Sequence, residues 1–297
     1  MPPDTEHRAP GYPTCLRTRE MIKMTYDPTL FLGTAAYYSS GRPPYSGDLV
    51  PTLVAEARLD GSGRLLDVGC GPGSLSLALA NHVEDVIGLD PDREMLAEGM
   101  RQAAQSGVDN IHWVQGTAEE ISTLDLGMFR LVTFGQSFHW TDRESVVEMV
   151  YDRLELGGVL TVITHAHDGR PRPEGPGYPP IPHEAIRALI ERYLGPQRRA
   201  GQGVYAIPTD PHEDLLARSR FGASRSLFCA GRDDIVQDVD GVLANYFSTS
   251  FAAPHLFGDR RARFEKDVHA ALTACSPSGL FWDWPGDTQI LLAGKTG

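Results

Sequence analysis

Several sequence features are scarce or absent in this chain of 297 residues, and each absence excludes a class of protein. Its four cysteines, Cys15, Cys70, Cys229 and Cys275, form no CxxC pair, so the sequence predicts neither a zinc site nor a disulfide framework. No apolar run approaches the ~20 residues that a membrane-spanning helix needs. Lys and Arg number 27 against 39 Asp and Glu, and the resulting formal charge of -12 repels phosphate backbones. We therefore expect no bound metal, no membrane span and no nucleic-acid substrate.

Residues 1–24 differ in character from the rest of the chain. They show no hydrophobic periodicity, contain several prolines and have no apolar signal core. We expect a flexible N-terminal extension, with Met21 or Met24 as alternative starts, and a cytoplasmic protein. The remaining chain is apolar enough for a substantial core, since hydrophobic residues make up 41% of the sequence.

From residue 51 onward, helical stretches alternate with short apolar strand patterns as far as residue 164, which predicts an α/β doubly wound sheet. A first helix is expected over 51–57. Residues 168–182 are rich in proline, which removes backbone donors, so they should form a surface loop between a core over 25–167 and the rest of the same domain over 183–297. In that last part, the pattern predicts helices over 184–194, 233–247 and 260–274 and strands over 224–229 and 288–293.

The most informative segment is an apolar strand that breaks into three alternating glycines, Gly69, Gly71 and Gly73. Residues without a Cβ let the chain turn sharply and bring bare amides close to a ligand. Asp67 precedes the loop, and Ser74 stands where a dinucleotide-binding fingerprint has Gly or Ala, so the motif fits S-adenosylmethionine better than NAD. A plain strand-to-helix turn is the alternative interpretation.

A second buried strand pattern ends in Asp90, followed by Pro91 and a helical stretch. A carboxylate at such a strand end, about 20 residues beyond a glycine loop, can accept both hydroxyls of a ribose. Asp also favours the N-cap of a helix, which is the simpler interpretation of the same residue. The distance in sequence from the glycine loop favours the role of Asp90 as a ribose ligand.

With these motifs in place, the chain resembles a class I S-adenosylmethionine-dependent methyltransferase. The resemblance continues through Gly116–Ile121, Leu131–Gln136 and Leu154–Leu160, and it covers about residues 35 to 165. Within the class, Tyr38–Tyr45 and His139–Asp142 resemble trans-aconitate methyltransferases and related small-molecule enzymes. The resemblance implies a Rossmann-like sheet of seven strands, mostly parallel with the last strand antiparallel, and a helical insertion near the C-terminus.

The resemblance also implies a cofactor and its ligands. The cofactor is S-adenosyl-L-methionine, released as S-adenosyl-L-homocysteine. In the family, an acid is common beside the adenine ring, and Thr117 stands at that position here. Glu119 could compensate for the missing acid. Arg42 could pair with a carboxylate of the cofactor or of an acidic substrate, or it could equally form a surface salt bridge. The residues expected at the cofactor are Tyr38, Arg42, Asp67, Gly69, Cys70, Gly71, Gly73, Asp90, Pro91, Thr117, Ala118, Glu119 and Gln136.

Two histidines are candidate catalytic residues. The resemblance implies that His139 lies beside the methyl-transfer point, and His165 ends the fifth strand pattern. An unperturbed imidazole pKa near 6.5 suits a general base. The alternatives are that His139 only packs and caps a helix and that His165 is a solvated strand-end residue.

The expected reaction is an in-line displacement that methylates the oxygen of a small hydroxyl or carboxylate acceptor, and a base is needed only where the nucleophile carries a proton. N- or C-methylation, cofactor binding without transfer, and an NAD-dependent oxidoreductase remain open. The aromatic helices of about 233–274 are either a substrate cap or ordinary core. A homodimer is compatible with the sequence, but no feature of it requires one.

Overall fold

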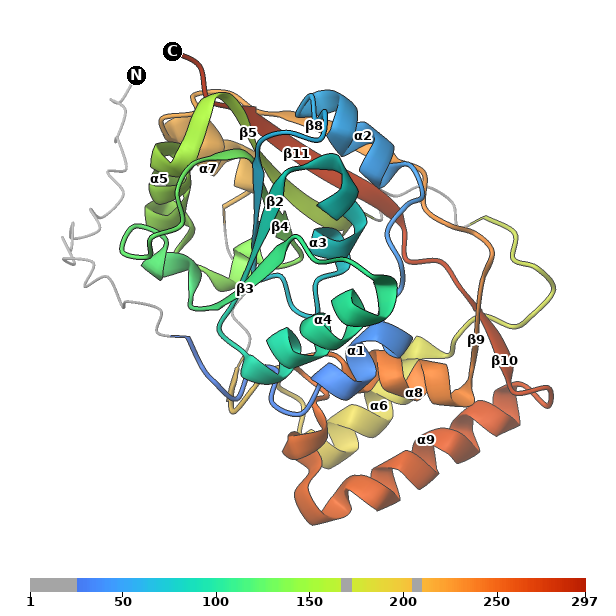
Figure 1. Cartoon of the computed structure of the whole chain (residues 1–297). Helices are drawn as coiled ribbons and strands as arrows, with labels where there is room; N and C mark the ends of the chain where they lie inside the picture. The colour runs from blue at the N-terminus through green and yellow to red at the C-terminus, as the bar shows by residue number, and fades with distance from the viewer. Residues whose placement is uncertain (1–25, 167–172, 205–209) are drawn as a thin grey trace, which may run out of the picture.

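The computed structural model of the chain describes residues 26–166, 173–204 and 210–297, so the predicted extension over 1–24 lies outside it. A seven-stranded sheet forms the centre, in the order β3-β2-β1-β4-β5-β11-β8 (Figure 1). All its strands run in the same direction except β11, which lies antiparallel between β5 and β8. The predicted α/β class and the reversed last strand are therefore confirmed.

The strands of this sheet are β1 (Arg64–Val68), β2 (Asp85–Asp90), β3 (Ile111–Gln115), β4 (Phe129–Gly135), β5 (Leu154–Ala166), β8 (Arg225–Cys229) and β11 (Asp287–Gly294). Two small sheets pair β9 (Ile235–Asp238) with β10 (Leu280–Asp283) and β6 (Arg199–Ala200) with β7 (Gly203–Val204). The helices are α1 (Ala35–Gly41), α2 (Leu49–Glu56), α3 (Ser74–Leu79), α4 (Arg93–Ser106), α5 (Arg143–Arg153), α6 (His183–Leu194), α7 (His212–Arg218), α8 (Val239–Phe247) and α9 (Arg261–Cys275), with 3-10 turns η1 (Ala80–His82), η2 (Ala118–Glu120), η3 (Phe138–Trp140) and η4 (Pro254–Arg260).

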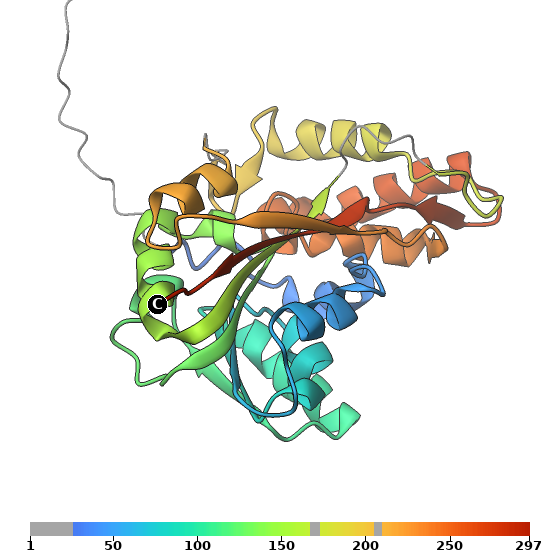
Figure 2. The ribbon, with the colours of Figure 1, turned by 90° about the horizontal axis from the view of Figure 1, so that it is seen from above.

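Helices cover both faces of the sheet because successive strand residues point to opposite sides. Leu65 packs in one core cluster with α2 and α3, whereas its neighbour Leu66 packs in the other with α5 and α7. Figure 2 shows these helices on either side of the curved sheet. The carboxyl ends of the parallel strands are thereby left open to one edge.

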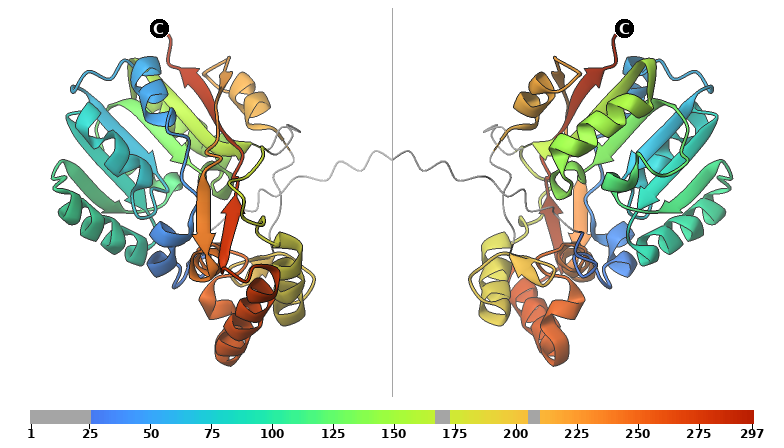
Figure 3. Two further views of the ribbon diagram at one scale, coloured as in Figure 1. Left: turned by 90° about the vertical axis from the view of Figure 1, so that its right-hand side faces the viewer. Right: turned by 90° about the vertical axis from the view of Figure 1, so that its left-hand side faces the viewer.

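A second group of elements lies at one end of the sheet, where α6, α8 and α9 gather beyond strands β9 and β10 (Figure 3). Its core is aromatic: the rings of Phe257 and Phe264 stack at 4.0 Å, and Phe247 is equally buried. The aromatic residues noted over 233–274 therefore pack against one another as core.

The helix predicted over 233–247 is wrong in its first half. Ile235–Asp238 forms strand β9 instead, antiparallel to β10. The helix begins only after Asp238, whose side chain accepts a hydrogen bond from the Gly241 N–H at 2.8 Å. An N-cap of this kind fixes where a helix starts, and the β-branched residues before it pair as a strand.

Residues 173–182, the described part of the predicted Pro-rich loop, form no helix, and their only β-contact is a bridge between Pro180 and Trp282. Residues 168–172 lie outside the described residues. Across the three described ranges, no helix is both long and apolar enough to cross a membrane.

Candidate functional site

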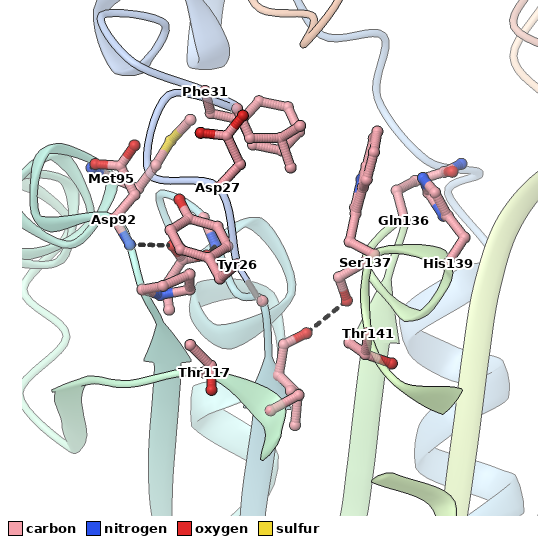
Figure 4. A pocket seen from close by; sticks show the side chains of 18 of the residues that line it. Tyr26, Asp27, Phe31, Asp92, Met95, Thr117, Gln136, Ser137, His139 and Thr141 are labelled. Carbon is pink, nitrogen blue, oxygen red and sulfur yellow. Dashed lines mark hydrogen bonds between the residues drawn. The ribbon is translucent and has the colours of Figure 1, made fainter. Parts of the chain in front are cut away.

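A cavity of about 300 Å³, called the first cavity here, opens at the carboxyl ends of β1, β2 and β4 (Figure 4). In sheets of this kind that edge is where ligands bind, since the loops after the strands converge there. Figure 4 shows Asp92 and Met95 on one side of the cavity and Gln136, Ser137 and His139 across from them.

The glycine loop after β1 forms the floor of the first cavity. The Gly69 and Cys70 N–H groups both donate to the Leu89 carbonyl, at 2.8 and 3.1 Å, which ties the loop to β2. All three glycines have positive φ, at 64° for Gly69, 56° for Gly71 and 83° for Gly73. This conformation is one that residues with a Cβ rarely adopt, so the loop depends on glycine.

Asp90 ends β2 beside this loop, and its buried carboxylate accepts hydrogen bonds from two backbone N–H groups. One oxygen accepts from the Gly71 N–H and the other from the Asp92 N–H, each at 2.8 Å. Burial is the largest influence on this carboxyl and raises its pKa to about 6. A carboxylate has about four acceptor positions, so Asp90 can still accept hydrogen bonds from a ligand.

The carboxylate of Asp67 is hydrogen-bonded to other parts of the fold. It accepts from the Ser76 N–H at 3.2 Å, from the Ser76 hydroxyl at 2.7 Å and from the Thr133 hydroxyl at 2.8 Å. These bonds join β1 to the first turn of α3 and to β4. Burial raises the pKa of this carboxyl, and the three hydrogen bonds oppose that effect.

A second cavity of about 650 Å³ adjoins the first and shares Tyr38, Gly69, Gly135 and Gln136 with it. The backbone of Gln136 is held at φ 58°, and its N–H donates to the Ile163 carbonyl at 3.0 Å. A non-glycine residue in this region is unusual and tends to occur at ligand sites.

Arg42, Tyr45 and His165 line the second cavity. The Arg42 guanidinium lies 4.9 Å from the Tyr38 ring, and its Nη2 donates to the Ser248 carbonyl at 2.8 Å. Its Nε is buried and has no hydrogen-bond partner among the described residues. The Tyr45 and His165 rings stack at 5.3 Å, so both aromatic faces form one wall.

His139 lies on the first cavity, with its ring 4.7 Å from that of Trp140. Burial, followed by the positive charges of His212, Arg198, Arg42 and Arg143, lowers the pKa of His139 to about 4. The imidazole is therefore neutral at pH 7, which leaves it able to accept a proton but makes it a weaker base than the unperturbed side chain expected from the sequence.

Comparisons with known proteins agree with this geometry. Residues 65–158 match the family model of a methyltransferase domain. The chain is 27% identical over 137 residues to the uncharacterized methyltransferase YcgJ of Bacillus subtilis, which covers 46% of this chain and 54% of that protein. It is 34% identical over 145 residues to the uncharacterized methyltransferase Rv3342 of Mycobacterium tuberculosis, covering 48% and 56% respectively.

A third relative is malonyl-[acyl-carrier protein] O-methyltransferase of Enterobacter lignolyticus, 34% identical over 162 residues that cover 53% of this chain and 62% of that protein. The chain carries a class I S-adenosylmethionine-dependent methyltransferase domain. It spans little more than half the length of the curated relatives it matches. The crystal structure of YcgJ aligns with a TM-score of 0.49 at 18% identity, covering 84% of this chain and 98% of that chain.

S-adenosylmethionine is the cofactor of this methyltransferase domain, and the residues present fit it. Asp90 has unused acceptor capacity toward ribose hydroxyls, and Gly69 and Gly71 line the first cavity without side chains. In the adjoining cavity, the unpartnered Nε of Arg42 suits a carboxylate, such as that of the methionine portion. The site thus offers a group for each polar end of the cofactor.

The structure distributes the predicted site residues of the methyltransferase domain over both cavities. The first cavity brings together Tyr38, Gly69, Gly71, Asp90, Pro91, Thr117, Ala118, Glu119, Gln136 and His139. The second cavity adds Arg42, Asp67, Cys70 and His165. Gly73 lines neither, because its role lies in the turn of the loop.

At the predicted adenine edge, Thr117 and Glu119 are partly engaged within the protein. The Thr117 N–H donates to the Glu120 carboxylate at 2.7 Å in a capping box. The Glu119 carboxylate accepts from the Asp142 N–H at 2.8 Å, which ties η2 to the start of α5. The compensating role considered for Glu119 remains a prediction.

Several lining residues of the first cavity carry no sequence motif and were missed. One set belongs to the segment before α1, namely Tyr26, Asp27, Leu30 and Phe31, and another to the β6–β7 hairpin, namely Ala200, Gly203 and Val204. The one available signal was the Asp-Pro-Thr turn, in which the Asp27 side chain accepts from the Thr29 N–H at 2.8 Å. It predicts a turn but not its position over the cavity.

Helices α8 and α9, expected as a substrate cap, contribute no residue to the first cavity, so that role remains a prediction. No cluster of at least three His, Cys, Asp or Glu side chains suited to a metal ion occurs in the described part of the chain.

Proposed function

We propose that the chain transfers the methyl group of S-adenosylmethionine to an oxygen atom of a small-molecule acceptor. The observation that carries the proposal is the pairing of the Asp90 carboxylate with the Gly71 N–H in a cavity that continues into a second one. The first cavity suits the adenosine portion, the second has room for the methionine tail, and the acceptor would lie where the two cavities meet. When bound, the cofactor supplies an electrophilic methyl group on a positively charged sulfur.

Large apolar residues of the first cavity exclude water from the reactants. Trp140 meets Phe31 edge to face at 5.9 Å, so two large apolar rings cover the first cavity beside His139. Since the leaving thioether is neutral, no strong acid is required, and most of the rate enhancement comes from positioning.

A hydroxyl acceptor would give the neutral His139 a part in the transfer. As a neutral imidazole at pH 7, His139 can take the proton of a hydroxyl acceptor, whereas a carboxylate acceptor needs no base. His165, on the second cavity, is the other candidate for the same role. Two matched proteins are named as O-methyltransferases, of malonyl-[acyl-carrier protein] and in ubiquinone biosynthesis, and they support oxygen as the acceptor atom.

A transfer assay with methyl-labelled S-adenosylmethionine tests the proposal against pooled hydroxy acids, carboxylic acids and phenols. We expect labelled product from at least one pool. With a hydroxyl acceptor, His139→Ala should lower kcat by about 10²-fold at saturating cofactor, since general-base catalysis contributes typically 10²–10⁴-fold. His112→Ala is the control, because His112 is an exposed strand residue paired with Asp85.

Absence of labelled product from every pool, in protein that binds S-adenosylhomocysteine, would instead support a cofactor-binding protein without transfer. Methylated amines or carbon acids would support N- or C-methylation, and stabilisation by NAD alone would support the oxidoreductase. The membership of the trans-aconitate-like group, a cytoplasmic location and a homodimer remain predictions.

A further inference from the structure

A third cavity, of about 530 Å³, lies in the helical group beside the sheet and shares no lining residue with the first two. It is bounded by one face of α6, by the end of α8 with Phe251, and by residues 195–199 that lead into the β6–β7 hairpin. Cavities of 300–1,000 Å³ are the usual size for small-molecule sites. None of its lining residues contacts the proposed cofactor site, although the charge of Arg198 contributes to the lowered pKa of His139.

Part of the wall of the third cavity is apolar and aromatic. Ile190 and Leu194 of α6 face it, together with the rings of Tyr246 and Phe251, which meet edge to face at 6.4 Å. The Tyr246 hydroxyl is held by His183 Nδ1 at 2.8 Å, which fixes the ring in place. This wall suits the apolar body of an organic molecule.

The polar part of the lining is dominated by guanidinium groups, from Arg187, Arg198 and Arg199, against the single carboxylate of Glu191. The carbonyl ends of α6 and α8 add about half a negative charge each, which the three guanidinium groups oppose. Within the described residues, Arg187 forms no hydrogen bond or ion pair, and Arg198 lies 4.8 Å above the Phe251 ring. Three arginines on one cavity wall are notable in a chain of formal charge -12.

We propose that the third cavity binds a small organic anion, in which one carboxylate or phosphate group is attached to an apolar body, at a site separate from that of the cofactor. Arg187 and Arg198 hold the anionic group, since guanidinium pairs well with both kinds of oxyanion. The rings of Tyr246 and Phe251 contact the apolar body.

The cavity is placed to act on the methyl-transfer site. Arg199 lines the third cavity, while Ala200, Gly203 and Val204 of the same hairpin line the first. An anion bound in the third cavity would therefore hold the β6–β7 hairpin, which forms part of the wall of the first cavity.

Calorimetric titration of the full chain with phenyl phosphate, benzoate and benzyl alcohol tests the proposal. We expect at least one of the two anions to bind at least tenfold more tightly than the uncharged alcohol, and the comparison of phenyl phosphate with benzoate identifies the preferred anionic group. Binding should persist when S-adenosylhomocysteine saturates the protein. Equal affinity for anions and alcohol, or displacement of the anion by S-adenosylhomocysteine, would overturn the proposal.

The double variant Arg187→Gln/Arg198→Gln should weaken binding of the preferred anion at least tenfold. Arg263→Gln removes an exposed arginine that does not line the cavity, and it should leave the affinity within twofold. S-adenosylhomocysteine is titrated into each variant as a measure of folding and as a separate test of the cofactor site. An equal loss of anion affinity in the Arg263→Gln control, with cofactor binding intact, would contradict the assignment of the site but leave the proposed methyl transfer standing.

Discussion

At the scale of single residues, two buried carboxylates at adjacent strands have different tasks. Asp67 has its hydrogen bonds within the fold, from Ser76 and Thr133, and so fastens α3 to the sheet. Asp90 holds only backbone N–H groups of its own loops and keeps capacity for a ligand. The sequence suggested both as cofactor residues, because an Asp near the glycine loop looks the same in either role.

The pKa of Asp90 leads to a pH-dependent affinity for the cofactor product. In the free protein, this pKa is raised to about 6, so the carboxyl takes up a proton as the pH falls below that value. Ribose hydroxyls donate more strongly to the ionised form. The affinity for S-adenosylhomocysteine should therefore fall by up to about tenfold between pH 7 and pH 5, measured by calorimetry.

Two variants separate Asp90 from other titrating groups. Asp90→Asn cannot ionise, so its affinity should be weaker at pH 7 and nearly constant down to pH 5. Asp109→Asn, in the exposed loop before β3, should retain the dependence of the unchanged protein. A steep pH dependence that survives in Asp90→Asn would assign the effect to another group.

At the scale of elements, the sheet strands and most helices could be predicted because their periodicity is local. The predicted helix over 260–274 and the observed α9 (Arg261–Cys275) differ by one residue at each end. Strand β9 was missed because Ile235–Asp238 is short and runs directly into α8, and its pairing with β10 depends on residues more than 40 positions away. Local patterns carry no information on such a partner.

The turn from β1 into α3 depends on a contact that no motif reveals. The Trp113 ring of β3 packs against Gly73, Gly88 and Gly99, and a Cβ at Gly73 would lie 2.4 Å from its Cη2 atom. The ring lies equally close to α4, since a Cβ at Gly99 would lie 2.6 Å from the same atom. The glycine required by this packing is therefore structural.

Replacement of Gly73 by Ala should lower the free energy of unfolding by about 1–3 kcal/mol more than replacement of Gly107 by Ala. Both positions have positive φ, at 83° and 68°, so both variants bear the same kind of backbone strain. At Gly107, however, a Cβ would meet no atom within 4 Å. Urea denaturation of the two variants measures the difference, and equal destabilisation would show that the Trp113 contact is unimportant.

At the scale of the whole molecule, the first cavity is assembled from segments far apart in the chain. The glycine loop and Asp90 could be predicted as its base, because spacing within one strand–helix–strand unit is fixed by the fold. The segments that cover the cavity could not be predicted. Tyr26 and Phe31 precede α1, and Val204 lies in the β6–β7 hairpin, and only tertiary packing brings them over the same cavity.

The low pKa of His139 has the same long-range origin. Burial contributes most, and charges from Arg198 and Arg42, both distant in sequence, add to it. The sequence therefore indicated the residue but not its protonation behaviour, which depends on the complete arrangement of both parts of the molecule.

The central claim is that the edge formed by the glycine loop and Asp90 holds an adenosyl sulfonium cofactor. Calorimetric titration of the full chain with S-adenosylhomocysteine, beside an identical titration with NAD, tests it most directly. We expect saturable binding of one S-adenosylhomocysteine per chain, weakened by about 1–3 kcal/mol in Asp90→Ala, and no heat from NAD. Folded protein that binds NAD, or that gives no heat with S-adenosylhomocysteine or S-adenosylmethionine, would contradict the claim.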